Sequence, residues 1–125
     1  MPVDQGRTHN NDMHRCIENC TQCHDICAET IQYCLQMGGK HASADHIRLL
    51  LDCVDICRTS ANYMLRGSDL HMETCAVCAD VCERCAKSCE VMGDDATMRR
   101  CADTCRQCAD SCRRMAGKTR IAHAA

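Results

Sequence analysis

The chain has 125 residues, of which sixteen are cysteine, eight methionine and seven histidine, and its formal net charge is −2. This length accommodates one domain with one core. A small charge of mixed signs gives no electrostatic basis for binding nucleic acid or an anionic membrane, and no apolar run approaches the length of a membrane span. We therefore predict one domain with no nucleic-acid or membrane partner.

The first residues have none of the features of an export signal. Residues 1–10 (MPVDQGRTHN) contain no apolar stretch and no twin-arginine pair. In the cytosol thiols stay reduced, and clustered cysteines more often bind metal than form disulfides. We therefore expect a cytoplasmic protein in which residues 1–10 form a flexible N-terminal tail.

Four long periodic stretches follow one another along the chain, and we predict helices at 11–37, 43–66, 68–92 and 95–116. Glycines of the kind found just beyond a helix end follow these stretches, at Gly38, Gly39, Gly67, Gly93 and Gly117. Candidate N-caps come next, at Ser43, Ser68 and Asp94 or Asp95. Because short links make each helix antiparallel to its predecessor, we predict an all-α, antiparallel up-down-up-down four-helix bundle over 11–117. Residues 118–125 are expected to form a flexible C-terminal tail.

The cysteines follow the spacing of a helix-bundle core. Nearly all stand three or four residues from the next one, at Cys16, Cys20, Cys23, Cys27, Cys34, Cys53, Cys57, Cys75, Cys78, Cys82, Cys85, Cys89, Cys101, Cys105, Cys108 and Cys112. This is the spacing of the inward positions of a coiled coil. At about 100° per residue, the thiols of the first helix fall on one narrow face. We therefore predict a cysteine-lined core, with fewer thiols on the second helix, which carries only Cys53 and Cys57.

A disulfide-stapled or redox structural bundle is one alternative. Residues three or four apart on a helix have Cβ atoms about 5–6 Å apart, whereas a disulfide needs roughly 3.5–4.5 Å. Bridges within a helix would strain it, and bridges between helices would have no unique pairing among sixteen close neighbours. The pattern therefore favours metal over disulfides.

Charge balance distinguishes the soft metals that thiolates prefer, which are Cu(I), Zn(II) and the iron of iron–sulfur clusters. Buried, uncompensated thiolate charge is costly. Zinc at four thiolates per ion would neutralise only part of it, whereas Cu(I) at about one ion per bridging thiolate neutralises it all. No Cys-Pro of a ferredoxin-type run is present. We predict that all sixteen cysteines bind multiple Cu(I) ions, with a zinc–thiolate reservoir as the alternative.

The sequence resembles the copper storage proteins, a bacterial family of cysteine-lined four-helix bundles. The resemblance covers about residues 11–116 and rests on seven Cys-x-x-x-Cys motifs: CIENC, CHDIC, CVDIC, CADVC, CAKSC, CADTC and CADSC. It implies many Cu(I) ions held inside each bundle, mainly by thiolates. The missing export signal resembles the cytosolic branch of the family, whose members are typically tetramers, so a homotetramer is expected.

Nothing in the sequence favours an enzyme. No cysteine is distinguished from its fellows as a nucleophile, and no glycine-rich phosphate loop is present. We therefore expect storage or sequestration of copper without catalysis.

Histidine and methionine residues near the bundle ends are candidate accessory ligands. One end gathers Met13, Met64, His71, Met72 and Met115, and the other gathers Met37, His46, Met92 and Met98. A thioether or a neutral imidazole can pass on Cu(I) while holding it less tightly than a thiolate, although methionine can equally fill a bundle end as an adaptable hydrophobe. Both ends are therefore candidate points of copper passage, and we favour the end with Met13, Met64, His71 and Met115.

Overall fold

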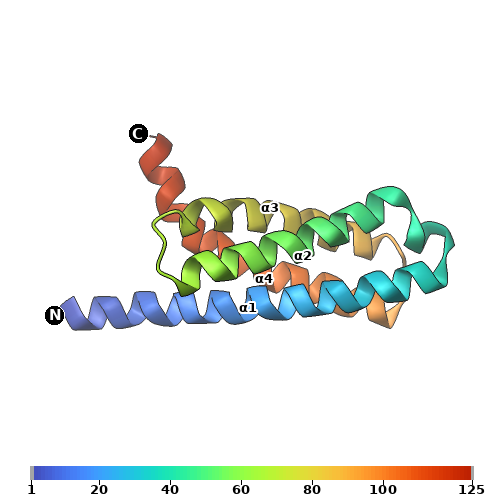
Figure 1. Ribbon diagram of the computed structural model, residues 1–125, viewed down its shortest axis with the longest axis horizontal. Helices are drawn as coiled ribbons and strands as arrows, with labels where there is room; N and C mark the ends of the chain where they lie inside the picture. The colour runs from blue at the N-terminus through green and yellow to red at the C-terminus, as the bar shows by residue number, and fades with distance from the viewer. Residues whose placement is uncertain (1, 125) are drawn as a thin grey trace.

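The computed structural model describes the backbone of residues 2–124 and the side chains of residues 11–116. Its elements are α1 (Pro2–Met37), the 3₁₀ helix η1 (Gly39–Ala42), α2 (Ala44–Leu65), α3 (His71–Glu90) and α4 (Ala96–Ala124). Each helix runs antiparallel to its predecessor, and α1 begins at the end of the molecule where α4 finishes (Figure 1). The predicted all-α, up-down-up-down bundle is confirmed.

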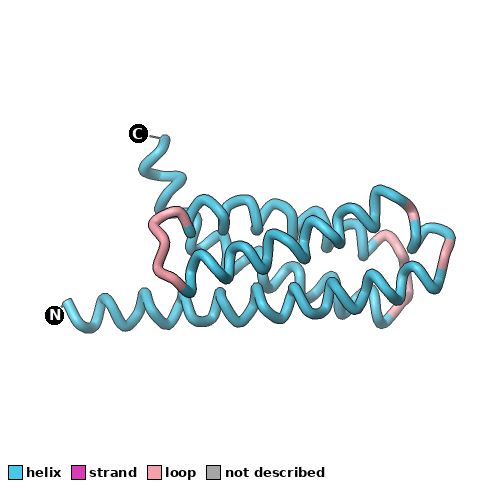
Figure 2. Tube along the Cα trace, viewed as in Figure 1, coloured by secondary structure: helices cyan, strands magenta, loops and turns pink. Residues whose placement is uncertain are grey.

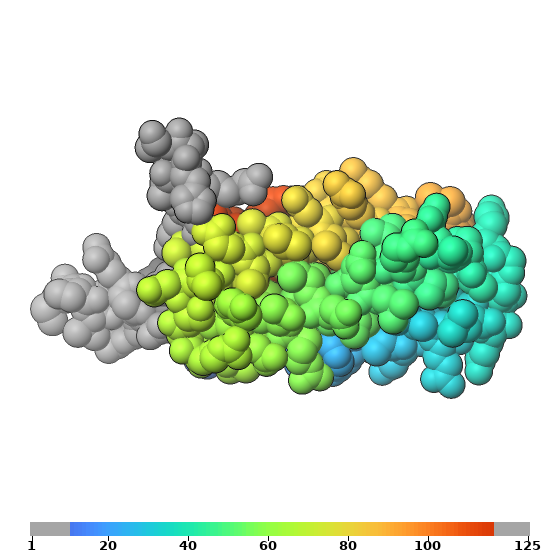
Figure 3. All heavy atoms as spheres, turned by 45° about the horizontal axis from the view of Figure 1, so that its top comes forward, coloured from blue at the N-terminus to red at the C-terminus, as the bar shows by residue number. Residues whose placement is uncertain are grey.

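The helices surround one central core. α1 packs against α2 and α4, and α3 packs against the same two helices, so each diagonal pair faces across the core. Short loops join the helices in chain order (Figure 2), which explains the antiparallel topology. On the face shown in Figure 3, α2 and α3 lie side by side.

Turn chemistry sets several helix ends. Gly67 and Gly93 have φ values of 66° and 80°, a left-handed conformation that residues with a Cβ avoid. Ser43 occupies the predicted N-cap position of α2, but its side chain makes no capping hydrogen bond. Asp95 precedes α4, and its Oδ1 accepts hydrogen bonds from the backbone N–H groups of Thr97 and Met98 at 3.0 and 3.2 Å.

Three predicted helix limits were wrong. α3 begins at His71 rather than at Ser68, because Ser68 forms a turn in which its Oγ accepts the N–H of Leu70 at 3.1 Å. α1 begins at Pro2 rather than at residue 11, and α4 continues beyond Gly117 to Ala124. One glycine within a helix costs only about 1 kcal/mol, and the good helix formers Lys118, Arg120 and Ala122 are among the residues that follow it.

The predicted flexible tails, residues 1–10 and 118–125, lie outside the part of the chain whose side chains are described. Their flexibility and the domain limit at 11–117 remain predictions. Within the described residues, no helix has both the length and the apolar character needed to span a bilayer.

Candidate metal centre

All sixteen cysteines lie in the core, each with 0% of its surface exposed. α1 and α3 contribute five each, α4 contributes four, and α2 contributes Cys53 and Cys57. The remaining buried positions of α2 are filled by other side chains: His46, Leu50, Ser60, Ala61 and Met64. The structure therefore confirms the prediction that the second helix, α2, carries fewer core thiols than the others.

Every cysteine is a free thiol. The shortest sulfur–sulfur separations are 3.6 Å, as between Cys16 and Cys112 and between Cys53 and Cys82. A disulfide bond is about 2.05 Å long. The core thus holds sulfur atoms in contact but not bonded, which is the arrangement a metal–thiolate site requires.

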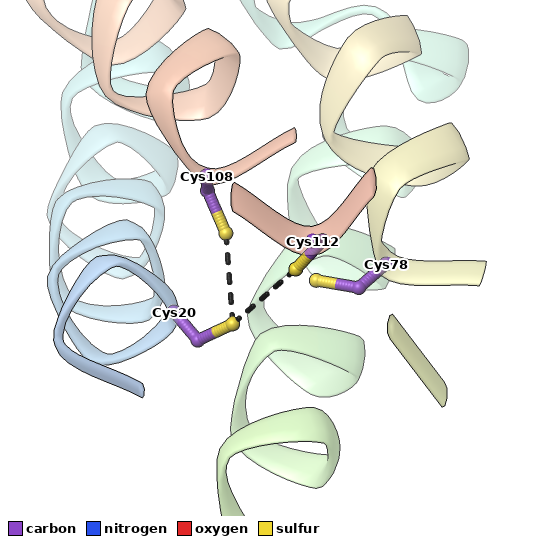
Figure 4. A group of neighbouring side chains, drawn as sticks. All are labelled: Cys20, Cys78, Cys108 and Cys112. Carbon is purple, nitrogen blue, oxygen red and sulfur yellow. Dashed lines mark hydrogen bonds between the residues drawn. The ribbon is translucent and has the colours of Figure 1, made fainter. Parts of the chain in front are cut away.

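The sulfur atoms gather into groups of four, each drawn from three helices. Four such groups have all Sγ atoms within 4.8 Å of one another. Figure 4 shows one of them, in which Cys20 of α1 lies 3.6 Å from Cys112 and 3.7 Å from Cys108, with Cys78 of α3 beside them. A fifth group, of three thiols, contains Cys16, Cys75 and Cys112.

These groups overlap. Seven of the twelve cysteines in them belong to two groups at once: Cys23, Cys53, Cys57, Cys78, Cys82, Cys108 and Cys112. A closed zinc site needs four ligands of its own, whereas a thiolate that bridges two ions suits overlapping groups. The geometry therefore supports a multinuclear cluster better than a set of separate tetrahedral sites.

Sulfur contacts continue along the bundle axis. From Cys16 to Cys101, each thiol lies within 4.0 Å of the next along the path Cys16–Cys112–Cys20–Cys108–Cys57–Cys82–Cys53–Cys23–Cys105–Cys27–Cys101. This path includes thiols from all four helices and alternates mainly between α1 and α4. Soft ions bound anywhere along it would always have a thiol of the next layer within reach.

A mixed set of donors completes the core at the η1 end. Cys34 Sγ lies 3.4 Å from His46 Nε2 and 3.7 Å from Met98 Sδ. The other ring nitrogen of His46, Nδ1, lies 2.7 Å from Ser88 Oγ. The tautomer that donates its Nδ1–H to Ser88 leaves the Nε2 lone pair facing Cys34. A thiol, an imidazole and a thioether therefore converge here.

The opposite end is also built from sulfur and polar groups. Met64 Sδ lies 3.9 Å and Ser60 Oγ 3.2 Å from Cys75 Sγ. Met64 and Met115 are buried, with 2% and 4% exposed. His71 is 8% exposed, and its Nδ1 lies 2.8 Å from the carbonyl oxygen of Ser68.

Met13 is half-buried and packs against the core. The structure thus places Met13, Met64 and Met115 at or in the core. Whether any of them binds copper stays a prediction.

Burial favours neutral forms of the groups at the two ends. It raises the pKa of the Cys34 thiol from the ordinary 9.0 to about 11, with a smaller contribution from Cys101. Cys112 lowers the pKa of Cys75, but Cys16 and burial outweigh that effect and raise it to about 12. Burial lowers the pKa of His46. The neutral imidazole of His46 can bind a metal ion directly. The Cys34 thiol can do so once it loses its proton.

Sequence reasoning placed Met98 at the η1 end of the bundle but not beside Cys34, and it did not consider Ser88. Met98 is completely buried, and its helical spacing from Cys101 could have identified it as an inward residue. Ser88 precedes Cys89 and is only half-buried. The spacing of residues along α3 therefore does not predict its hydrogen bond with His46. That contact depends on how α2 and α3 pack.

A family model described as copper storage protein matches residues 9–117. The chain belongs to the copper storage protein family. The family resemblance drawn from the Cys-x-x-x-Cys motifs is confirmed, and so is the expectation of a storage protein in place of an enzyme. This family accounts for a core of free, overlapping thiols that stability alone would not require.

Solved structures support membership of the copper storage family. The Nmul_A1745 protein from Nitrosospira multiformis is 45% identical, with a TM-score of 0.81, over 86% of this chain and 97% of that one. Cu(I)-bound copper storage protein BsCsp3 is 36% identical, with a TM-score of 0.78, over 84% and 98%. A cytosolic copper storage protein from Streptomyces lividans, loaded with five coppers, is 27% identical, with a TM-score of 0.74, over 86% and 93%.

One curated relative matches over a shorter region. The uncharacterized cysteine-rich protein YhjQ of Bacillus subtilis is 38% identical over 66 residues, which are 53% of this chain and 61% of YhjQ. The match therefore covers less than two thirds of that relative.

Proposed function

We propose that this copper storage family member sequesters many Cu(I) ions in the cytosol, bound by the thiolates that line its bundle. The observation that carries the proposal is the buried path of sulfur atoms, in which each thiol lies within 4.0 Å of the next from Cys16 to Cys101. Cu(I) is monovalent and soft, so about one ion per thiolate keeps this buried core neutral. The cytosolic Streptomyces lividans relative and the reduced thiols support the location.

All sixteen cysteines are the proposed ligands. Their complete burial, and the overlap of the four-sulfur groups, support bridging thiolates shared between ions. The proposed accessory ligands lie at the bundle ends: His46, His71, Met13, Met64 and Met115. Among these, the 3.4 Å contact between His46 and Cys34 and the 3.9 Å contact between Met64 and Cys75 are the strongest support.

Titration of the reduced protein with Cu(I) in the presence of a competing chelator tests the function. We expect about fourteen to twenty ions per chain, as the neutrality of sixteen thiolates requires. Saturation at about four ions, with zinc preferred over copper, would instead establish a zinc reservoir. A thiol count on freshly purified, unreduced protein that finds few free thiols would establish the disulfide-stapled alternative.

A matched pair of variants sharpens the count. Cys53 belongs to two four-sulfur groups, whereas Cys34 belongs to none. We expect Cys53→Ser to lower the Cu(I) capacity by more ions than Cys34→Ser, because a bridging thiolate serves more than one ion. Equal losses would show that the overlap of the groups has no bearing on how copper is held.

We further propose that the protein forms a homotetramer, as the family resemblance implies. A shallow groove between α2 and α3 is lined by the apolar residues Ile56, Val77 and Val81 and by Asp52, Asp55 and Thr59, and Val77 and Leu51 are 52% and 49% exposed. Apolar side chains gathered in this way suit contact with another copy of the chain. Sedimentation equilibrium is expected to give four times the chain mass, and a single-chain mass would exclude the assembly.

A further inference from the structure

One surface pocket reaches His46, the residue whose other side contacts the sulfur core. It has a volume of about 200 Å³ and lies between the η1–α2 corner and the end of α3, with Lys40, Ser43, His46, Ser88 and Met92 among its lining residues. It is thus on the flank of the bundle near one end. Its deepest member is His46, which is only 2% exposed.

His46 separates this pocket from the thiols. On the pocket side its Nδ1 lies 2.7 Å from Ser88 Oγ, and on the core side its Nε2 lies 3.4 Å from Cys34 Sγ. The imidazole ring of His46 therefore lies between the pocket and the Cys34 thiol. A change of its side-chain torsion, with loss of the Ser88 contact, would turn the unprotonated Nε2 from Cys34 toward the pocket.

From the pocket to the core, the side chains that can bind Cu(I) become progressively stronger ligands. The thioether of Met92, half-buried, lies in the pocket lining. The imidazole of His46 comes next, and the thiol of Cys34 follows, with Met98 Sδ 3.7 Å from it. Because Cu(I) is stable with two or three ligands, an ion can move inward by exchanging one ligand at a time.

We propose that this pocket is a side port through which Cu(I) passes between solvent and the core, with His46 as the relay and Met92 as the outer donor. The inference rests on the proposed storage of Cu(I). When the ion binds Cys34, a Cu–S bond replaces the S–H bond and the proton is released to solvent. The port lies at the end opposite to Met13, Met64, His71 and Met115, where Met64 and Met115 are packed into the core.

The test measures the rate of copper uptake. Reduced full-length protein is mixed without oxygen with Cu(I) held by bicinchoninic acid, and loss of the coloured chelate reports transfer. For His46→Ala we expect uptake slower by about tenfold, the scale on which loss of one group at a metal site acts. For Met92→Leu, which keeps an apolar side chain but removes the thioether, we expect slowing by about threefold.

Met37→Leu is the matched control. Met37 ends α1 at the same end of the bundle, is 53% exposed, and does not line the pocket, so uptake is expected at the wild-type rate. Equilibrium titration of each variant is expected to show a capacity within about one ion of wild type, since at most one donor is removed. Circular dichroism verifies that His46→Ala is folded, and Met92→Leu changes only a half-buried loop residue.

Two results would overturn the port. One is wild-type uptake rates in both His46→Ala and Met92→Leu. The other is slow uptake in His71→Ala while His46→Ala remains fast, which would place copper passage at the opposite end. Failure of the storage function is a separate outcome, because the wild-type protein would then fail to take up many Cu(I) ions at equilibrium.

Discussion

Asp95 joins three elements of the η1 end. Its Oδ2 accepts a hydrogen bond from Tyr33 Oη at 2.8 Å and lies 3.0 Å from His41 Nε2, while its Oδ1 caps α4 through Thr97 and Met98. Burial by itself raises the pKa of Asp95, but these hydrogen bonds outweigh it and lower the pKa overall. The ionised carboxylate therefore holds α1, η1 and α4 together around the copper-facing end.

Replacing this carboxylate is expected to destabilise the bundle. Asp95→Ala removes an N-cap and the partner of two side chains, so we expect a loss of about 2 kcal/mol in the free energy of unfolding. Urea unfolding of the reduced, metal-free protein measures it. Asp94→Ala is the control, because the Asp94 side chain is 97% exposed and forms a surface ion pair with Arg99. Its expected effect is within about 0.5 kcal/mol, and equal effects of the two variants would contradict this account of Asp95.

On α2, the buried thiols and the buried apolar packing residues occupy clearly separate positions. Its buried face carries Cys53 and Cys57 in the middle, but Leu50 one turn earlier and Met64 near the end. Leu50 is completely buried. It supplies the apolar contact area that the small thiols of α1, α3 and α4 do not.

Leu50→Ala should therefore affect stability and leave copper capacity unchanged. We expect a loss of about 2–5 kcal/mol in the free energy of unfolding, because the substitution leaves a cavity in the core, and a Cu(I) titration identical to that of wild type. Leu65→Ala on the same helix is the control, since Leu65 is 66% exposed, and its expected change is within about 0.5 kcal/mol. A reduced copper capacity in Leu50→Ala would show that α2 packing shapes the metal centre.

For the whole molecule, the thiol core links stability to pH and to metal. Protonated thiols are compatible with an apolar interior, so we expect the reduced, metal-free protein to be folded and helical by circular dichroism. Copper ions then replace the thiol protons inside a bundle that is already folded. An unfolded metal-free form would contradict this view.

The raised pKa values of Cys34 and Cys75 give the sign of the pH dependence. Below the ordinary thiol pKa of 9.0, folded and unfolded chains are both protonated, and the full stability is present. Above it the unfolded chain loses these protons first, so stability falls as pH rises toward the folded values of about 11 and about 12.

The metal-free protein should consequently melt at a lower temperature at about pH 10 than at about pH 7. The copper-loaded protein is the control, because its thiols are already deprotonated, and its melting temperature should change less. The same decrease in both forms would show that groups other than the thiols cause it.

The sequence by itself determined the four helices, their antiparallel order and the inward face of every cysteine, because these follow from spacing along a helix and from short links. It also led to the copper storage family through seven repeated motifs. Helix limits at residues 68 and 117 were missed, since the Ser68 turn and the tolerance of a helix for one glycine depend on local backbone geometry.

Only the tertiary structure decided which thiols stand together and how the core meets the surface. Cys20 and Cys112, or His46 and Ser88, are far apart in the chain, and no spacing rule relates residues on different helices. Their contacts depend on the rotation and relative height of packed helices. The side port depends on the same variables, because it exists only where the α2 corner and the end of α3 leave His46 between solvent and sulfur.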